Sequence, residues 1–132
     1  MKITDYQGNE LLDLSGLTSV LVGNGWTAYK YPNGYVEMTK IISISGSTAN
    51  IAGNIYRILG SDVTSFPVGV KGLLGKSVQL LTNNDGNVLG ASHYGNDSLS
   101  KTSFGNIAVW EIATQSRTLS VNLMLEIKGK WK

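Results

Sequence analysis

The chain has 132 residues, of which 42% are hydrophobic and 15% charged, and it contains no cysteine. This length is typical of one domain with one core, and the lack of Cys excludes disulfides, thiolate nucleophiles and Cys-ligated zinc. The 11 basic and 9 acidic residues give a net charge of +2 and are spread along the chain, so we expect no nucleic-acid or membrane partner. With 16 Gly, 14 Ser, 10 Thr and 11 Asn, the composition is typical of a turn-rich β protein.

The first 25 residues predict an irregular N-terminal arm. Glycine recurs at positions 8, 16, 23 and 25, which disfavours a long helix, and at most a short strand is expected over 19–22. The arm carries apolar side chains that need cover from this domain or from a neighbouring subunit. They are Leu11, Leu12, Leu14, Leu17, Val20, Leu21 and Val22. We therefore divide the chain into 1–25, an irregular N-terminal arm, and 26–132, a β-sandwich domain.

Clear strand signals begin at Trp26. Residues 26–31 and 35–41 flank Pro32-Asn33-Gly34, in which Pro fixes one φ and Asn-Gly tolerates positive φ. This pattern predicts a β-hairpin. Its second strand is expected to continue through Ile44 and to stop at a Gly-Ser pair.

The rest of the chain predicts further short strands. Residues 48–76 favour strands joined by loops, including 66–70, while 54–59 fits a strand or a helix. Residues 77–82 and 88–94 enclose an Asp-Gly turn and predict a second hairpin. A strand at 107–113 precedes the last strand, where apolar and mainly polar residues alternate; its apolar members are Leu119, Val121, Leu123, Leu125 and Ile127. Seven or eight short strands indicate an all-β antiparallel sandwich or a jelly-roll-like fold.

Catalytic chemistry has little support in the sequence. His93 is the only histidine, and the pattern around it favours a partly exposed strand residue over a catalytic base. The nine acids could supply a carboxylate pair for glycoside cleavage, but Glu37, Glu111 and Glu126 are expected at outward-facing or edge positions of strands. We expect no enzyme, no metal site and no cofactor.

Aromatic side chains are the remaining candidates for a binding site. Rigid amphipathic rings stack on sugars or anchor protein interfaces, and hairpin tips would place polar groups beside them. The candidate ligand-binding residues are Tyr29, Tyr31, Tyr35, His93, Tyr94, Trp110, Asn84 and Asp85. Packing alone also favours aromatic residues in strands, so a purely structural role stays open. Trp26 and Trp131 are expected in the core or at a subunit contact.

Two segments resemble terminal domains of bacteriophage tail-fibre, tail-spike and baseplate proteins. The first is the opening W-T-A-Y-K-Y-P-N-G-Y-V-E over 26–37, and the second is the closing strand over 121–132, which ends in G-K-W-K. Between them, Phe66-Pro67-Val68 is similar to the family's Pro-containing middle strand. Many relatives carry Cys-Trp after the Glu, where this chain has Met38-Thr39.

The resemblance implies a homotrimeric receptor-binding protein at the end of a virion tail appendage, made in the host cytoplasm. Residues 26–132 would be its β-sandwich head domain, and residues 1–25 would serve oligomerisation or linkage to the shaft. Its partners would be a bacterial surface polysaccharide, two further copies of the chain and other tail or baseplate proteins. Three copies of a weak saccharide site would strengthen attachment through effective concentration. Two alternatives stay open: a purely structural virion protein of the baseplate or capsid decoration, and a polysaccharide depolymerase fragment.

Overall fold

The computed structural model describes residues 2–13, 19–84, 87–95 and 97–132. In these ranges the chain forms eleven β-strands and no helix, so none of it is a helix that could span a membrane. The strands are β1 (Lys2–Thr4), β2 (Glu10–Asp13), β3 (Ser19–Gly23), β4 (Trp26–Lys30), β5 (Tyr35–Ser47), β6 (Ala49–Ala52), β7 (Ile55–Asp62), β8 (Gly72–Asn83), β9 (Val88–His93), β10 (Gly105–Ile112) and β11 (Thr118–Lys130).

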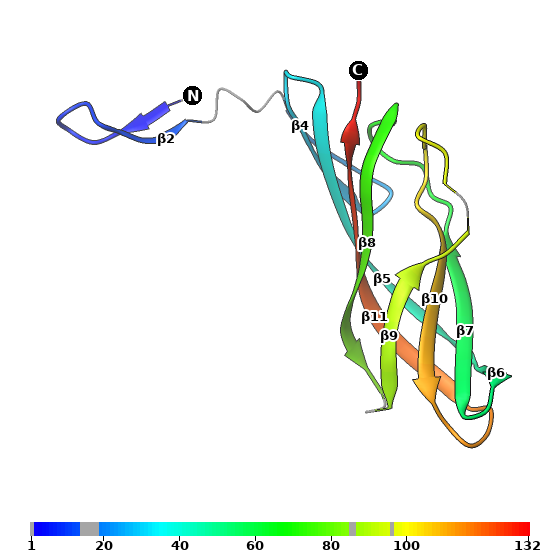
Figure 1. Cartoon of the computed structure of the whole chain (residues 1–132). Coiled ribbons are helices and arrows are strands. Elements are labelled where there is room, and N and C mark those ends of the chain that lie inside the picture. Colours follow the sequence, from blue (N-terminus) through cyan, green and yellow to red (C-terminus); the bar gives the residue numbers. More distant parts are fainter. Residues whose placement is uncertain (1, 14–18, 85–86, 96) are drawn as a thin grey trace.

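Two antiparallel sheets pack against each other to form the body of the molecule (Figure 1). The larger sheet has the order β3-β4-β5-β11-β8, and the smaller sheet has the order β6-β7-β10-β9. Strands β1 and β2 form a separate two-stranded hairpin, which stands apart from the body in Figure 1. The prediction of an all-β fold made of two packed antiparallel sheets is confirmed.

Strand β11 is an interior strand of the larger sheet and pairs along both of its edges. It pairs with β5 from Thr118↔Ser47 to Lys130↔Tyr35, and it pairs with β8 along its other edge. The five alternating apolar residues predicted from the sequence all face the core and are at most 1% exposed. Full burial of an aliphatic side chain stabilises a fold by about 1.5–3 kcal/mol, so this strand contributes strongly to stability.

Three aromatic rings fill the centre of the core. The fully buried Trp26 indole packs edge-on against Phe66, with ring centroids 5.0 Å apart, and it stacks on Phe104 at 6.2 Å. Trp131 is only partly buried and packs against the outside of this core, where its Nε1 donates a 2.8 Å hydrogen bond to the Tyr31 carbonyl. Of the two expected positions, core and subunit contact, Trp26 therefore occupies the core.

The first predicted hairpin is present as β4 and β5. The Tyr31 amide donates to the Tyr35 carbonyl at 2.9 Å, and Asn33 Oδ1 accepts a 3.0 Å hydrogen bond from the Tyr35 amide. Gly34 has φ +93°, a left-handed conformation that favours glycine. Gly34 thus has the positive φ expected of this turn, whereas Asn33 contributes through its side-chain hydrogen bond. The segment that fitted a strand or a helix, 54–59, is part of strand β7.

The prediction of a second hairpin is wrong, because β8 and β9 do not pair with each other. The chain reverses direction between β8 and β9, but β8 pairs with β11 in the larger sheet and β9 pairs with β10 in the smaller sheet. A turn signal specifies a reversal, whereas the pairing partner is set by which neighbours bury the inward faces. The reversal therefore joins the two layers of the sandwich.

Two other segments differ from expectation. Residues 66–70 form no strand beyond a single bridge between Val70 and Lys101, although Phe66, Val68 and Val70 are all buried. Pro67 has no amide hydrogen to donate to a ladder, which disfavours a strand there. Segment 1–25 is less irregular than expected, because it contains β1, β2 and β3, and β3 is an edge strand of the larger sheet. Residues 14–18, with Leu14 and Leu17, lie outside the described residues.

Candidate functional site

The outer face of the larger sheet gathers aromatic, acidic and basic side chains in adjacent rows. One row runs across four strands as Tyr29, Glu37, Lys128 and Gly75, which are cross-strand partners. The next row contains Thr27, Thr39, Glu126 and Ser77, and a third pairs Tyr35 with Lys130 and Gly72. Cross-strand partners lie on the same side of a sheet, so we call this surface the tyrosine face. Alternate residues such as Val36 and Met38 are fully buried on the opposite side.

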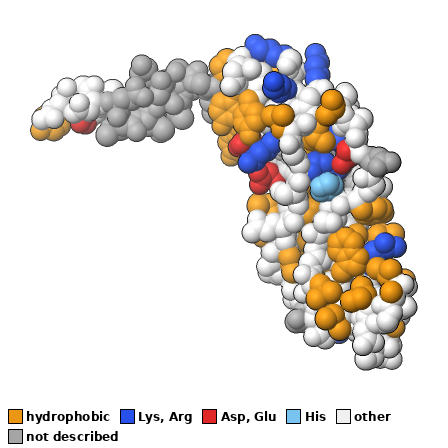
Figure 2. Space-filling model, in the orientation of Figure 1, with side chains coloured by type: hydrophobic (Ala, Val, Ile, Leu, Met, Phe, Trp, Pro, Cys, Tyr) orange, Lys and Arg blue, Asp and Glu red, His pale blue; other side chains and the backbone are white. Residues whose placement is uncertain are grey.

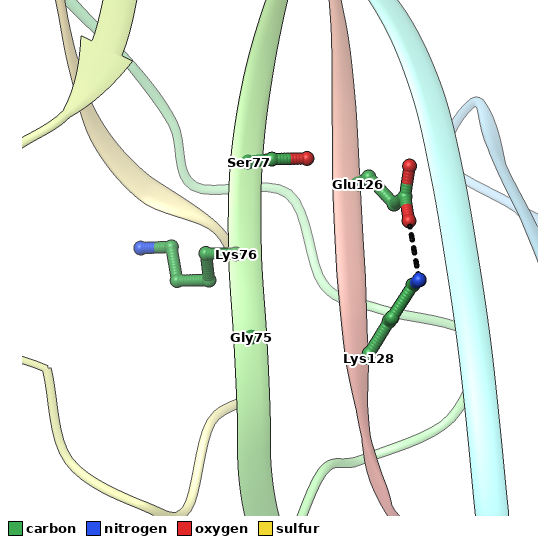
Figure 3. A pocket seen from close by; sticks show the side chains of 5 residues that line it. All are labelled: Gly75, Lys76, Ser77, Glu126 and Lys128. Carbon is green, nitrogen blue, oxygen red and sulfur yellow. Dashed lines mark ion pairs between the residues drawn. The ribbon is translucent and has the colours of Figure 1, made fainter.

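A hollow of about 170 Å³ opens on the tyrosine face between β8 and β11. It is lined by Gly75, Lys76, Ser77, Glu126 and Lys128. Figure 3 shows Ser77 directed toward β11, while the Lys76 side chain leaves β8 in the opposite direction. A Cβ at Gly75 would meet no atom within 4 Å, so the missing side chain leaves this space open. The hollow has room for roughly five waters at their share of liquid volume.

The charged groups of the tyrosine face are held by neighbours. Lys128 Nζ lies 3.3 Å from Glu126 Oε1, and both side chains are substantially exposed, at 47% and 32%. The Tyr35 hydroxyl donates a 2.7 Å hydrogen bond to Glu37 Oε1. Burial raises the pKa of Tyr35 to about 12, and the bond to Glu37 acts in the same direction. The phenol therefore stays protonated as a hydrogen-bond donor, and Glu37 keeps a second oxygen for another donor.

Three of the candidate residues from the sequence belong to this region. Tyr29 is 39% exposed on the tyrosine face, and Tyr31 lies at its end with its ring 5.8 Å from that of Tyr35. The partners Glu37, Glu126, Lys128 and Ser77 were not selected from the sequence as ligand-binding residues. Strand alternation could have placed Glu126 and Lys128 on an outward face, but only the register brings them beside Glu37.

Trp110 lies on the other side of the sandwich, on the outer face of the smaller sheet. Its cross-strand partners are Arg57 on β7 and Gly90 on β9. Around it, Leu59, Leu89 and Ile112 are 47%, 56% and 47% exposed. Figure 2 shows hydrophobic side chains gathered over this sheet, and we call this surface the Trp110 face. It is mainly apolar, in contrast to the tyrosine face.

His93 and Tyr94 lie at the end of β9 beside a partly buried charge cluster. His93 Nδ1 is 3.7 Å from Asp97 Oδ2, and Asp97 also accepts hydrogen bonds from Lys76 and Lys101. Burial alone would raise the pKa of Asp97, but the hydrogen bonds from Lys101 and Lys76 outweigh burial and hold the pKa below its usual value. The Lys76 side chain is only 2% exposed, and its Nζ also donates a 2.6 Å hydrogen bond to the Phe104 carbonyl. This cluster attaches the loop after β9 to β8.

Asn84 follows the opposite end of β8. Asn84 is engaged with the backbone of Ser120, to which its amide donates at 3.1 Å and from which its Oδ1 accepts at 3.0 Å. These bonds give Asn84 a structural role in the link between β8 and β11. Asp85 lies outside the described residues.

Glu111 corrects one expectation from the sequence. It was expected at an outward-facing or edge position, but it is fully buried between the sheets, where Arg117 Nε donates a 2.9 Å hydrogen bond to its Oε2. Its Oε1 has no hydrogen-bond partner in the part of the chain that the structure describes. The strand phase was misjudged because a carboxylate suggested an exposed position, whereas Arg117, six residues further on in the turn between β10 and β11, neutralises it.

Comparisons with known proteins give no match. No family model, no curated protein and no solved structure is similar to this chain. Among residues 2–13, 19–84, 87–95 and 97–132, no group of three or more His, Asp or Glu side chains is arranged to hold a metal ion. The candidate site is therefore defined by the geometry of the tyrosine face.

Proposed function

We propose that this chain is the receptor-binding head of a bacteriophage tail appendage and attaches to a saccharide on the bacterial surface. In this proposal it binds without cleaving, acts in the virion as a homotrimer, and contacts other tail or baseplate proteins. The observation that carries the proposal is the row of Tyr29, Glu37, Lys128 and Gly75 on the tyrosine face.

The chemistry of that row suits a sugar. Exposed tyrosine rings provide stacking surfaces for the apolar faces of sugar rings. The free oxygen of Glu37 and the Glu126 carboxylate accept hydrogen bonds from hydroxyls, and Lys128 and Ser77 donate them. The hollow beside Gly75 can accept one substituent of a sugar ring that lies on the tyrosine face.

The resemblance to phage tail proteins supports the same surface. The opening motif over 26–37 forms the β4–β5 hairpin, and the closing motif forms the end of β11. The two motifs are hydrogen-bonded neighbours, because Tyr35 and Glu37 pair with Lys130 and Lys128. The two terminal motifs therefore supply Tyr29, Glu37 and Lys128 of the tyrosine face, and β8 supplies Gly75.

The Trp110 face supports association between copies of the chain. Monomeric proteins rarely expose large contiguous apolar surfaces, and here Leu59, Leu89, Trp110 and Ile112 share one sheet face. In our proposal, neighbouring copies cover this face and leave the tyrosine face open on the other side of the sandwich. Three open sites then bind one polymer with greater avidity than a single site.

Saccharide binding is tested with the labelled full-length chain and a panel of purified bacterial polysaccharides: lipopolysaccharide O-chains, capsules and wall teichoic acids. Binding to at least one polymer is expected, and Gly75→Leu should weaken it at least about tenfold because the new side chain fills the hollow. Gly69→Leu is the matched control, since a Cβ at Gly69 also meets no atom within 4 Å but the residue lies in the loop before β8.

The same experiment separates the alternatives. If neither the polymers nor whole cells of any tested strain bind the chain, the receptor-binding proposal is wrong and a purely structural virion role is favoured. If the bound polymer becomes shorter during incubation, the chain is a depolymerase. An unchanged polymer length together with binding is the result that we expect.

The assembly is tested separately by light scattering at micromolar concentration. We expect three times the mass of one chain, and we expect Leu59→Glu with Ile112→Glu to reduce it to a single chain. Leu74→Glu is the control, because Leu74 is 61% exposed on β8 of the other sheet. A stable monomer of the unmodified chain would contradict the trimer.

A further inference from the structure

The charges of the protein are segregated in space, although they are spread evenly along the sequence. Five basic side chains have an acidic partner: Lys40, Lys76, Lys101, Arg117 and Lys128. Five others in the described part of the chain make no ion pair: Lys30, Arg57, Lys71, Lys130 and Lys132. Four of these five unpaired cations, all except Arg57, converge at one end of the larger sheet.

Trp131 is the centre of this convergence. Lys30 Nζ lies 4.0 Å from the centroid of its ring, and Lys132 Nζ lies 5.2 Å from it. Two ammonium groups thus make cation–π contacts with the same indole ring. The Lys71 amide donates a 2.8 Å hydrogen bond to the Lys130 carbonyl. The backbones of these two lysines therefore lie side by side, next to Trp131. We call this group the lysine pole, and Figure 2 shows Lys and Arg side chains gathered at that end of the body.

The lysine pole is continuous with the tyrosine face. Lys130 is the cross-strand partner of Tyr35, and Tyr31 accepts the hydrogen bond from the Trp131 indole at its carbonyl. Lys128 and Glu126 follow on the same side of β11, at steps of roughly 7 Å. A ligand that crosses the tyrosine face along β11 therefore meets carboxylates first and unpaired ammonium groups at the end.

We infer that the ligand of this surface is an anionic polysaccharide, one whose repeat carries a carboxylate or a phosphate that binds at the lysine pole. The inference rests on the proposed saccharide-binding function and specifies its ligand. The unpaired ammonium groups repel one another, and an anionic group of the ligand relieves that repulsion.

The pattern of charge favours a polysaccharide over a nucleic acid or an anionic membrane. A nucleic acid presents a phosphate at every nucleotide, so its backbone would be repelled by Glu37 and Glu126 beside the pole. A sugar polymer with one acid per repeat places neutral, hydroxyl-rich rings over those carboxylates and its charge over the lysines. On this surface the unpaired lysines lie at one end, and Glu37 and Glu126 lie beside them. This arrangement matches a polymer that carries one acidic group per repeat.

The polysaccharide panel is divided into anionic and neutral members, and any bound uronic-acid polymer is also tested after chemical reduction of its carboxyl groups. We expect the full-length chain to bind anionic members, to lose at least about tenfold in affinity between 50 and 200 mM NaCl, and to lose similar affinity for the reduced polymer. Lys30→Gln with Lys130→Gln and Lys132→Gln should abolish the preference for the charged form. Gln115→Glu is the control, because it also lowers the net charge but lies in the turn before β11, at the opposite end of that strand from the lysine pole.

The outcomes separate this inference from the function on which it rests. Binding that is confined to neutral polymers, or equal for a polymer and its reduced form, overturns the inference and leaves the saccharide-binding proposal in place. Tighter binding to a 20-nucleotide single-stranded DNA or to phosphatidylglycerol vesicles also overturns it. Absence of binding to every polysaccharide overturns both. As a readout that does not depend on affinity, the bound polymer should protect the lysines of the pole from acetylation, and an unchanged extent of acetylation in the complex would overturn the inference.

Discussion

The Tyr35 hydroxyl donates a 2.7 Å hydrogen bond to Glu37, two residues along the same strand and on the same face. Both residues lie on β5, where alternate side chains point outward, so the contact needs no rearrangement of the backbone. The bond orients one oxygen of Glu37 and leaves the other oxygen available to a ligand. This pair therefore links the aromatic and the acidic parts of the tyrosine face.

The titration of Tyr35 tests this contact. Burial and the bond to Glu37 raise the pKa of Tyr35 to about 12, so its absorbance change should occur at higher pH than the ordinary tyrosine value of 10.0. Glu37→Gln should lower the pKa of Tyr35, because it removes the carboxylate that disfavours a phenolate. Ultraviolet absorbance at 295 nm, with Tyr35→Phe for assignment, measures the shift. An unchanged titration in Glu37→Gln would show that the hydrogen bond does not form.

The buried pair of Glu111 and Arg117 predicts a large effect on stability. Arg117→Ala leaves a fully buried carboxylate without its cation, which should cost about 3–5 kcal/mol in the free energy of unfolding. Urea denaturation measures the loss. Glu111→Gln with Arg117→Met should recover much of it, since no uncompensated charge remains. If Arg117→Ala unfolds at the urea concentration of the unmodified chain, the pair contributes nothing.

Acid stability should depend on Asp62 and Asp97. Burial would raise the pKa of Asp62, but hydrogen bonds from Lys40 and Thr64 outweigh burial and lower it, as the lysines do for Asp97. A pKa that is lower in the folded state contributes stability above the unfolded value, near 3.8, and this contribution is lost as the pH falls through the folded value. The free energy of unfolding should therefore decrease below about pH 4.

Asp62→Asn with Asp97→Asn provides the comparison for the acid experiment. The double variant should be less stable at pH 7 and should lose less further stability between pH 5 and pH 2, as measured by urea denaturation at each pH. Equal slopes for the variant and the unmodified chain would assign the acid sensitivity to other carboxylates.

Two glycines should respond in opposite ways to the same substitution. A Cβ at Gly129 would lie 2.6 Å from Val70 Cγ1 and 2.8 Å from the Gly72 carbonyl oxygen, so Gly129→Ala should destabilise the fold by about 1–3 kcal/mol. A Cβ at Gly90 meets nothing within 4 Å, so Gly90→Ala should change stability little. Thermal unfolding of the two variants compares them directly. Equal melting temperatures would contradict the close approach of β11 to the start of β8.

Much of the fold could be predicted from periodicity and turn residues. The alternation from Leu119 to Ile127 defined a buried face, and Pro32-Asn33-Gly34 defined a hairpin, because both signals are local. The pairing of β8 with β11 could not be predicted, since strand partners are chosen by burial across the whole molecule rather than by the nearest turn. Glu111 was misplaced because the cation that balances its charge, Arg117, lies outside β10 in the turn that follows. Strand alternation alone does not show that contact.

The candidate site was only partly predictable. Tyr29, Tyr31 and Tyr35 were selected for their chemistry and lie in one region, whereas His93, Trp110 and Asn84 were selected on the same grounds and lie in three other places. The lysine pole was missed altogether. Lys30, Lys71 and Lys132 are far apart in the sequence, and only the meeting of β4, β8 and the C-terminal segment around Trp131 brings them together.

The central position of β11 has a consequence for how the protein is made. This strand lies between β5 and β8, yet it is synthesised after every other described strand of the two sheets. The β4–β5 hairpin can form early, but the larger sheet cannot close until residue 130 has left the ribosome. Until then β5 and β8 each present an unpaired edge, which favours aggregation. The larger sheet therefore forms only after the other strands of the sandwich have been synthesised, and a chain that stops before β11 lacks the strand that joins both halves of this sheet.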